Sequence, residues 1–489
     1  MGRADVVASR LRAETIGQFA HAGATALLYV VLARLLSPDA YGLIFLALAV
    51  IQVSRVVSDW GIGKSTARYV SEYRVNDPTQ VRHILEFGGV VAITSVTLVG
   101  AVLYVSADWL ATLIGTPAVA PYLRVGTLVL VTFAGVSYLR AVFQGAEQIE
   151  YAGLIQGLEG LLRLLFATVF VLLGTGGLGA LTGFAIGGIV ACLIGVTTFY
   201  RRTYRPHLDD VGPIEDGLRR RIVEYALPLA ATRGANQLDR QVDTVLVGAI
   251  LTPVAVAYYS LAKQVVTIVD RPAKILGFVI APTLSADNAA GDTDTVRRLY
   301  EEALGYMLML YIPAGVGLVL VAEPVITLAF GSEYAGAAPV LQILALYAAL
   351  QGVLRITSEA LDYLGRAKTR AYARGTAAVA NVVLTVALLP VMGVVGAAWA
   401  TIVTHSLYTG VNLLIMYHEI RFDVYTIGWS VAQTTAITAA MAVVVVAVLT
   451  LTTAAWIAVP AIVSGVVVWA IGVHSAGLLD MRRVSAVVS

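Results

Sequence analysis

The sequence predicts an all-α polytopic membrane protein that crosses the bilayer with about fourteen helices. Hydrophobic residues make up 58% and charged residues 13% of the 489 residues, and the mean hydropathy is +0.81. Soluble domains carry roughly 25% charged residues, so lipid rather than water solvates most of this surface. Apolar runs of about 20 residues, the length of a membrane-spanning helix, recur from end to end. Lys and Arg gather in alternate loops between these runs.

The apolar runs place the elements in order along the chain. The expected spans are 13–35, 41–62, 84–105, 121–142, 153–174, 178–199, 223–250, 254–276, 303–325, 336–356, 370–390, 394–416, 428–450 and 454–474. The segments between them are short, and we expect them to be solvated loops. The chain has a single cysteine, Cys192, so no intrachain disulfide can form. This cysteine lies inside an apolar run.

The basic residues predict the orientation in the membrane. Lys and Arg cluster at 64–82, 201–221, 271–298, 355–374 and 482–483, whereas the intervening loops hold few of them. Cytoplasmic loops carry an excess of Lys and Arg. We therefore expect an even number of spans with both termini in the cytoplasm, and location in the cell membrane.

Two parts of the chain resemble each other. VVLARLLSP at 30–38 corresponds to VLVGAILTP at 245–253, and GGLGA at 176–180 corresponds to GVVGA at 393–397. Each pair occupies the same place in a set of six spans, a pattern typical of transporters built from repeats. We expect a six-helix half at 1–200, a cytoplasmic linker at 201–222, a second six-helix half at 223–417, and two extra helices with a short cytoplasmic tail at 418–489.

Several ionisable residues lie deep inside expected spans, where charge is costly and usually faces a polar cavity. Arg163 is about ten residues into its span, near the midplane at 1.5 Å per residue. Arg233, Gln237 and Arg240 are spaced by four and three residues, so they share one helix face. Lys263 lies near mid-depth in the next span. We predict that these five residues form a cationic substrate-binding surface, because Arg binds phosphate oxygens through a bidentate fork.

Four carboxylates are candidates for coupling or gating. Glu159 is one turn from Arg163, so this arginine has two interpretations, a structural ion pair or a phosphate contact. Asp243 is three residues from Arg240 and could pair with it. Asp59 and Asp270 lie near the cytoplasmic edge, where snorkelling makes charge cheap and favours a structural role.

No enzyme motif is present. The sequence lacks a GxxxxGK[ST] phosphate loop, an HExxH motif and a Cys/His cluster with metal-ligand spacing. We expect no catalytic residue, no metal and no cofactor, although coupling to Na⁺ or H⁺ stays open. A membrane glycosyltransferase would need a sizeable domain outside the membrane, and none of the expected loops is long enough.

Short motifs carry a resemblance to a known family. They are ARLLSPDAYG at 33–42, DWGI at 59–62, DTVLVG at 243–248 with YYSLA at 258–262, and FGSEY at 330–334 with APVL at 338–341. In this order the chain resembles the oligosaccharide-lipid flippases of polysaccharide biosynthesis, in the multidrug/oligosaccharidyl-lipid/polysaccharide transporter superfamily.

The resemblance implies a V-shaped, alternating-access flippase for a polyprenyl-phosphate- or pyrophosphate-linked oligosaccharide. It also implies membrane lipids and glycan-assembly enzymes as partners, a monomeric state and no nucleic acid. Two alternatives stay open, namely an ion-coupled multidrug exporter of the same superfamily and a peptidoglycan-precursor lipid flippase. The exporter predicts an acidic lumen, which the cations at Arg163, Arg233 and Lys263 disfavour.

Overall fold

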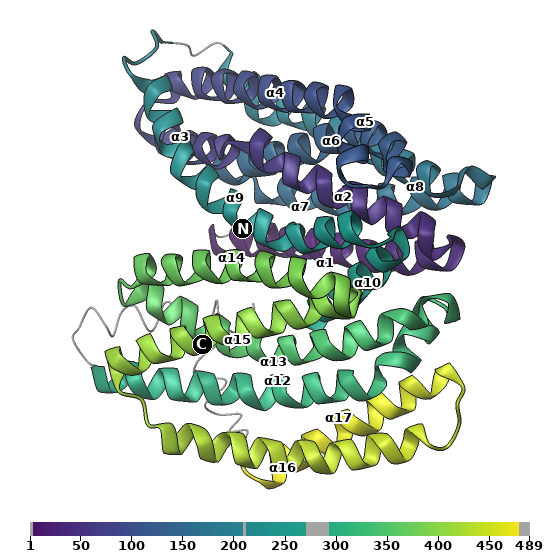
Figure 1. Cartoon of the computed structure of the whole chain (residues 1–489). Helices are drawn as coiled ribbons and strands as arrows, with labels where there is room; N and C mark the ends of the chain where they lie inside the picture. The colour runs from purple at the N-terminus through teal and green to yellow at the C-terminus, as the bar shows by residue number, and fades with distance from the viewer. Residues whose placement is uncertain (1–2, 209–211, 270–292, 479–489) are drawn as a thin grey trace. The chain divides into compact units, whose positions relative to one another are not determined.

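The computed structural model describes residues 3–208, 212–269 and 293–478. These residues form α-helices joined by short 3-10 and π segments, and no strand occurs among them. The chain divides into two compact units, Met1–Val256 and Ala257–Ser489. Figure 1 shows the helices of each unit running side by side.

The first unit contains nine helices among the residues described. They are α1 (Arg3–Leu35), α2 (Pro38–Asp59), α3 (Ile62–Asn76), α4 (Val81–Val105), α5 (Ala107–Leu113), α6 (Ala120–Gly145), α7 (Ile149–Phe170), α8 (Gly176–Phe199) and α9 (Leu218–Ile250). Helix α10 (Pro253–Val269) crosses the boundary into the second unit. The second unit continues with α12 (Thr293–Ala329), α13 (Ala338–Tyr363), α14 (Ala367–Met392), α15 (Val394–Ile420), α16 (Val424–Leu449) and α17 (Ala458–Ser475).

Each of the fourteen expected spans overlaps one of these helices. Within the described parts of the chain, ten helical segments are long and apolar enough to cross a membrane. One of them, Ile149–His207, holds both α7 and α8, whereas α9 and α15 carry polar or charged side chains and fall outside the set. The protein is therefore a multi-span membrane protein, and the count of fourteen spans stays a prediction.

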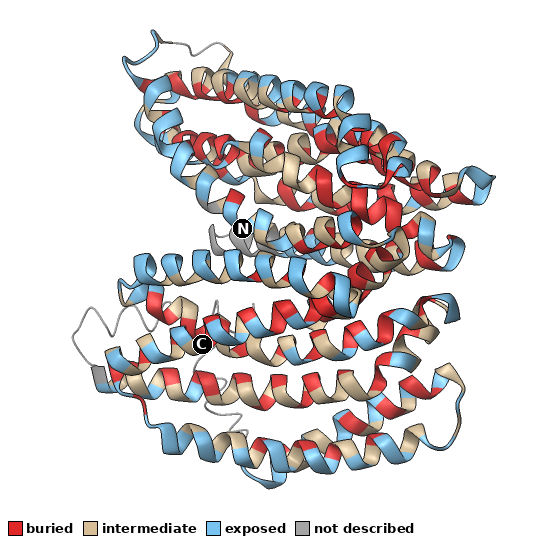
Figure 2. Cartoon of the chain, viewed as in Figure 1, coloured by how far each residue is buried: buried red, intermediate tan, exposed pale blue. Residues whose placement is uncertain are grey.

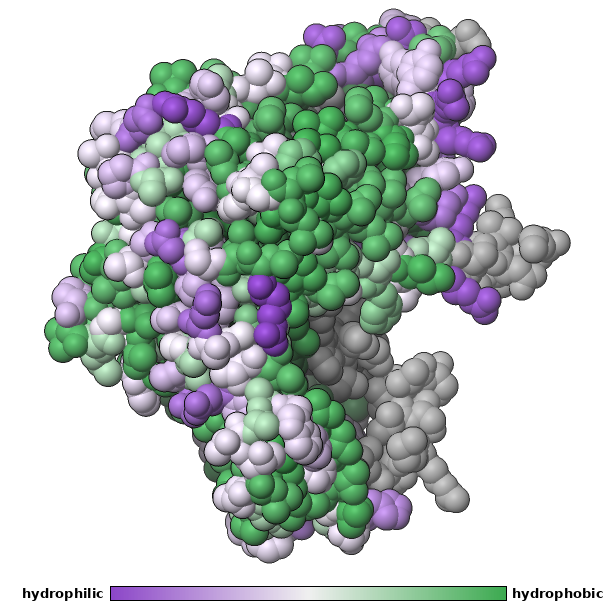
Figure 3. Space-filling view, turned by 90° about the vertical axis from the view of Figure 1, so that its right-hand side faces the viewer, coloured by the Kyte–Doolittle hydropathy of each residue, from purple (hydrophilic) through white to green (hydrophobic). Residues whose placement is uncertain are grey.

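Apolar side chains dominate the surface as well as the interior. Figure 2 shows buried residues along the helix faces that meet a neighbour and exposed residues on the outward faces. The outward faces include large apolar side chains, such as Ile93, Val105 and Val391, which are 68%, 82% and 81% exposed. Figure 3 shows a broad apolar area on one face of the molecule. Such a surface is stable in lipid and not in water.

Helix α3 corrects one expectation. The segment that follows the second span was expected to be a solvated loop, but Ile62–Asn76 is helical. Its buried residues include Tyr69, Val70 and Tyr73, which pack with α4 and α6. Tyr69 and Val70 are adjacent and Tyr73 follows three residues later, so the three side chains form a narrow apolar stripe on an otherwise polar helix. A stripe this narrow does not raise the mean hydropathy, which explains why the run was not recognised.

The linker between α8 and α9 is fixed to the first unit. The Tyr73 hydroxyl donates to Glu215 Oε2 at 2.5 Å, and Arg221 donates to Glu215 Oε1 at 2.6 Å. These hydrogen bonds hold the pKa of the Glu215 carboxyl below its usual range. Gln80 adds two bonds, to the Pro213 carbonyl at 2.8 Å and from the Glu215 amide at 3.0 Å. The N-terminal end of α9 is thereby held against α3.

Helix α9 packs on α2 and α3 and belongs to the first unit. A Cβ added at Gly61 would lie 2.6 Å from the Ala226 carbonyl oxygen, so the two backbones are in close contact there. The boundary of the compact units, after Val256, thus differs from the linker at 201–222 that the sequence repeat suggests. The division into two six-helix halves stays a prediction about the repeat.

Glycine allows α1 and α7 to approach each other at backbone distance. A Cβ at Gly17 would lie 2.0 Å from the Gly153 carbonyl oxygen, and a Cβ at Gly153 would lie 2.4 Å from Glu14 Cα. Small residues allow such contact between membrane helices, whose association depends on close packing rather than on the hydrophobic effect. This contact places the polar side chains of α1 directly against α7.

We predict that Gly153→Ala lowers the free energy of unfolding by about 1–3 kcal/mol, because the added methyl group meets backbone that cannot rotate away. The matched control is Gly23→Ala in α1, where an added Cβ meets nothing within 4 Å. Thermal unfolding in detergent measures both. Equal midpoints for the two variants would contradict the close α1–α7 contact.

Candidate functional site

A cavity of about 320 Å³ lies between α2, α6 and α9 of the first unit. The end of α2 and the turn after it contribute Arg55, Asp59 and Gly61, and α6 contributes Ser137. The turn is sharp because Trp60 and Gly61 both adopt left-handed backbone angles, with φ of 43° and 66°. The remaining wall is one face of α9, with Ala230, Arg233, Gly234, Asn236, Gln237 and Arg240.

The lining of this cavity is cationic. Arg55, Arg233 and Arg240 contribute three guanidinium groups, and Asp59 is the one carboxylate among the lining residues described. Arg233 Nη1 lies 3.6 Å from Asp59 Oδ2, and the two side chains are 38% and 30% exposed. The pair is therefore accessible from the cavity.

A second cavity of about 160 Å³ adjoins the first and shares Asp59, Ser137 and Arg233 with it. Its own lining adds Lys64 from α3 and Arg140 from α6. Arg140 also lies 3.8 Å from Glu14 of α1. Together the two cavities form one cationic surface on the described part of unit 1. We call this surface the arginine cavity and define it by Arg55, Lys64, Arg140, Arg233 and Arg240, with Asp59.

The structure brings three of the predicted substrate-binding residues together. Arg233, Gln237 and Arg240 line the arginine cavity, as their spacing on one helix face predicts. Asp59, predicted for coupling or gating, lies beside Arg233 from a different helix. Their contact with a substrate stays a prediction.

The other predicted residues lie elsewhere. Asp243 is buried further along α9. Lys263 belongs to the second unit, where its Nζ lies 5.5 Å from the centre of the Tyr259 ring. Asp270 lies outside the described residues. Each of these three roles stays a prediction.

Arg163 and Glu159 form an ion pair inside unit 1. The two residues are 6% and 5% exposed, and the Arg163 guanidinium carbon lies 4.0 Å from the centre of the Phe133 ring. His21 of α1 lies 3.9 Å from Glu159 and hydrogen-bonds the Gln156 carbonyl oxygen through Nδ1 at 3.1 Å. Because a carbonyl oxygen can only accept, Nδ1 carries the proton. This geometry fits a structural ion pair, and direct contact of Arg163 with a ligand stays a prediction.

Phe133 contacts one arginine of the buried pair and one arginine of the cavity. Its ring centre is 4.0 Å from the guanidinium carbon of Arg163 and 5.9 Å from that of Arg55. Cations within about 6 Å of an aromatic ring face are attracted to it. The ring therefore stabilises both guanidinium groups.

Sequence reasoning missed Arg55, Lys64 and Arg140. Arg55 and Arg140 lie inside expected spans, so the same signal that singled out Arg163 was present for them. Lys64 was taken as part of a solvated loop. Its position could not be inferred without recognising α3, which turns this side chain toward Asp59.

The arrangement can bind an anion and has no feature of a metal site. Guanidinium groups on different helices can surround a phosphate and donate several charge-assisted hydrogen bonds. Gln237 and Asn236 add neutral donors on the same wall. In the described residues no group of three or more His, Cys, Asp or Glu side chains could hold a metal ion.

Comparison with known proteins identifies the family. A family model described as polysaccharide biosynthesis protein matches residues 31–339, more than half of the chain. The chain belongs to this family.

Two curated relatives have names that refer to glycan or lipopolysaccharide biosynthesis. The probable low-salt glycan biosynthesis flippase Agl15 of Haloferax volcanii is 29% identical over 189 residues, which are 38% of this chain and 40% of Agl15. The lipopolysaccharide biosynthesis protein WzxC of Escherichia coli strain K12 is 23% identical over 342 residues, 70% of this chain and 65% of WzxC. The chain thus spans less than two thirds of the length of either relative.

Solved structures show the same fold. The lipid II flippase MurJ in an inward closed conformation gives a TM-score of 0.73 at 15% identity, covering 94% of this chain and 97% of MurJ. An inward-facing multidrug resistance MATE family transporter of the MOP superfamily gives a TM-score of 0.69 at 16% identity, covering 81% of this chain and 94% of the transporter. At these identities the likeness shows the fold alone, and this fold accommodates both lipid and drug transporters.

We predict that Arg163→Gln destabilises the protein by about 3–5 kcal/mol, because it leaves the Glu159 carboxylate buried and uncompensated. The double variant Glu159→Gln/Arg163→Gln should recover most of this loss. The control is Arg124→Gln, which breaks an exposed pair with Asp108 and should cost less than about 1 kcal/mol.

Unfolding midpoints in detergent measure the stability, and glycan export in cells measures function. An Arg163→Gln protein as stable as the wild type would contradict the structural pair. Full stability of the double variant with lost export would instead assign Arg163 to ligand binding.

Proposed function

We propose that the protein is a flippase. It moves an oligosaccharide linked to polyprenyl phosphate or pyrophosphate from the cytoplasmic to the outer leaflet, for surface polysaccharide or glycoprotein assembly. The observation that carries the proposal is the arginine cavity, since a concentration of cations inside a multi-span membrane protein suits an anionic headgroup. The family and the names of the curated relatives support it. The function is transport, and no catalytic step is part of the proposal.

The cavity disfavours a multidrug exporter for cationic drugs, although the fold is shared with MATE transporters. A lumen that binds organic cations requires an excess of carboxylates or aromatic rings, and the arginine cavity has one carboxylate to five basic side chains. A peptidoglycan-precursor flippase is the second candidate, because its lipid also carries pyrophosphate and the fold matches MurJ.

The membrane potential favours this direction of transport. Moving one negative charge outward across an inside-negative membrane is favourable by about 2.3 kcal/mol per 100 mV. The membrane potential is therefore sufficient to favour flipping of an anionic headgroup without a coupled ion, and the proposal leaves coupling to Na⁺ or H⁺ open. The proposal includes the cell membrane as location, cytoplasmic termini, a monomer, and glycan-assembly enzymes as suppliers and consumers of the lipid.

We predict that Arg233→Gln lowers the rate of flipping by roughly 10–100-fold, because the variant loses one charge-assisted hydrogen bond to the headgroup. Such a bond contributes about 1.5–3 kcal/mol. The matched control is Arg220→Gln on the same helix, where the side chain is 83% exposed and pairs with Glu224. Reconstituted vesicles with a fluorescent lipid-linked sugar measure the rate. Both variants should retain wild-type expression.

Equal flipping by Arg233→Gln and Arg220→Gln would remove the arginine cavity from the mechanism. If the protein flips a lipid-linked disaccharide-pentapeptide in preference to other lipid-linked sugars, it is instead a peptidoglycan-precursor flippase.

A further inference from the structure

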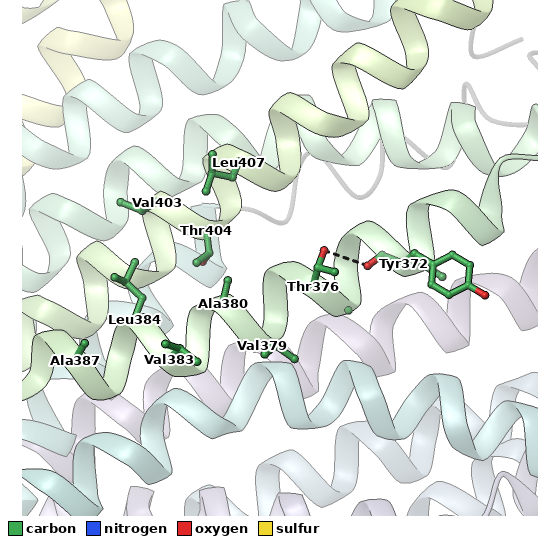
Figure 4. Close-up of a pocket in the computed structure, with 12 residues that line it drawn as sticks. Tyr372, Thr376, Val379, Ala380, Val383, Leu384, Ala387, Val403, Thr404 and Leu407 are labelled. Carbon is green, nitrogen blue, oxygen red and sulfur yellow. Dashed lines mark hydrogen bonds between the residues drawn. The ribbon is translucent and has the colours of Figure 1, made fainter.

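The second unit contains an apolar groove that the proposed function does not use. It has a volume of about 820 Å³ and lies along α14 and α15. Figure 4 shows its lining residues, which are Tyr372, Thr376, Val379, Ala380, Val383, Leu384 and Ala387 on α14 and Val403, Thr404 and Leu407 on the neighbouring α15. From Ala371 to Ala387 it extends roughly 24 Å at 1.5 Å per residue, most of the hydrocarbon core of about 30 Å.

The groove lies open because α14 is sparsely covered. Among the ten apolar helical segments in the described residues, α14 is the least buried. A Cβ added at Gly375 would meet nothing within 4 Å, so this glycine forms a shallow pit in the groove. The walls also carry the exposed side chains Tyr372, Val379 and Val383.

The two threonine hydroxyl groups of the groove are already satisfied. Thr376 donates to the carbonyl oxygens of Tyr372 and Ala373, at 3.2 and 2.9 Å. Thr404 donates to the Ala400 carbonyl at 2.7 Å and accepts from Asn381 at 3.2 Å. With their hydrogen bonds formed inside the protein, these groups require no polar partner. The groove therefore suits a hydrocarbon chain.

One end of the groove is basic. Residues 366–374 contain Arg366, Lys368, Arg370 and Arg374 and no acidic residue. Arg366 pairs with Glu419 at 2.7 Å and Arg370 pairs with Asp362. Lys368 is exposed and forms no ion pair with any residue that the structure describes. A ligand that lies in the groove with a negative group at this end would be matched in charge.

We propose that this groove binds the isoprenoid tail of the substrate lipid, with the phosphate beside Lys368 in the first-bound state, before the headgroup enters the arginine cavity. The proposal rests on the proposed function, which supplies a lipid with an anionic head and a long hydrocarbon chain. The branch methyl groups of an isoprenoid chain fit pits such as that at Gly375, whereas a straight acyl chain leaves them empty and loses those contacts. The tail then stays in contact with protein while the headgroup crosses.

The experiment is photolabelling of the full chain in phospholipid vesicles. The probe is a polyprenyl phosphate with a diazirine in its isoprenoid chain, and mass spectrometry locates the crosslinks. We expect labels on 371–387 and 403–407. Unmodified polyprenyl phosphate should compete at least about tenfold better than phosphatidic acid, a preference of about 1.4 kcal/mol. Equal competition by phosphatidic acid would show an ordinary phospholipid surface and overturn the proposal.

Gly375→Trp fills the pit, where an added Cβ meets nothing within 4 Å, and should lower labelling by about tenfold. The matched control is Gly428→Trp in α16, where a Cβ also meets nothing within 4 Å. Unchanged labelling in Gly375→Trp, or an equal loss in both variants, would also overturn the proposal. Labelling does not require translocation. Absence of labels in a protein that flips lipid-linked sugar refutes only the groove, and labels in a protein that flips none refute only the proposed function.

Discussion

A charge inside a bilayer needs either an opposite charge or water, and this constraint organises the first unit. Helices α1 and α7 pack at backbone distance at Gly17 and Gly153, and again at His21 and Gly160 beside Glu159. There Arg163 and Glu159 are buried and neutralise each other. Between α2, α6 and α9, beside the turn at Trp60 and Gly61, the arginines face a cavity instead. Close packing thus separates structural charge from accessible charge.

The fixed linker extends this organisation to α9. The hydrogen bonds among Tyr73, Glu215 and Arg221 hold the start of α9 against α3. As a result Arg233 and Arg240 stay opposite Arg55 within one compact unit. A site built inside a single unit keeps its charge arrangement when units move relative to each other, a useful property for a transporter that carries a headgroup across the membrane.

The sequence predicted the helices well because membrane-spanning helices depend on local hydropathy alone, and each expected span overlaps a helix. It predicted that Arg233, Gln237 and Arg240 share a face, since helical spacing is a local property. It could not pair Arg233 with Asp59, 174 positions away, because that contact depends on how α2 and α9 pack. Helix α3 was missed because Tyr69, Val70 and Tyr73 form too narrow a stripe to raise mean hydropathy.

The central claim is that the arginine cavity selects a phosphate group on a polyprenyl chain. The most direct measurement compares the binding of short-chain polyprenyl phosphate and of the corresponding uncharged polyprenol to the purified protein, by calorimetry in detergent. We expect the phosphate to bind at least about tenfold more tightly. Asp59→Asn, which removes the one carboxylate that lines the cavity in the described residues, should increase this preference. Equal binding of phosphate and alcohol, unchanged by Asp59→Asn, would contradict the account.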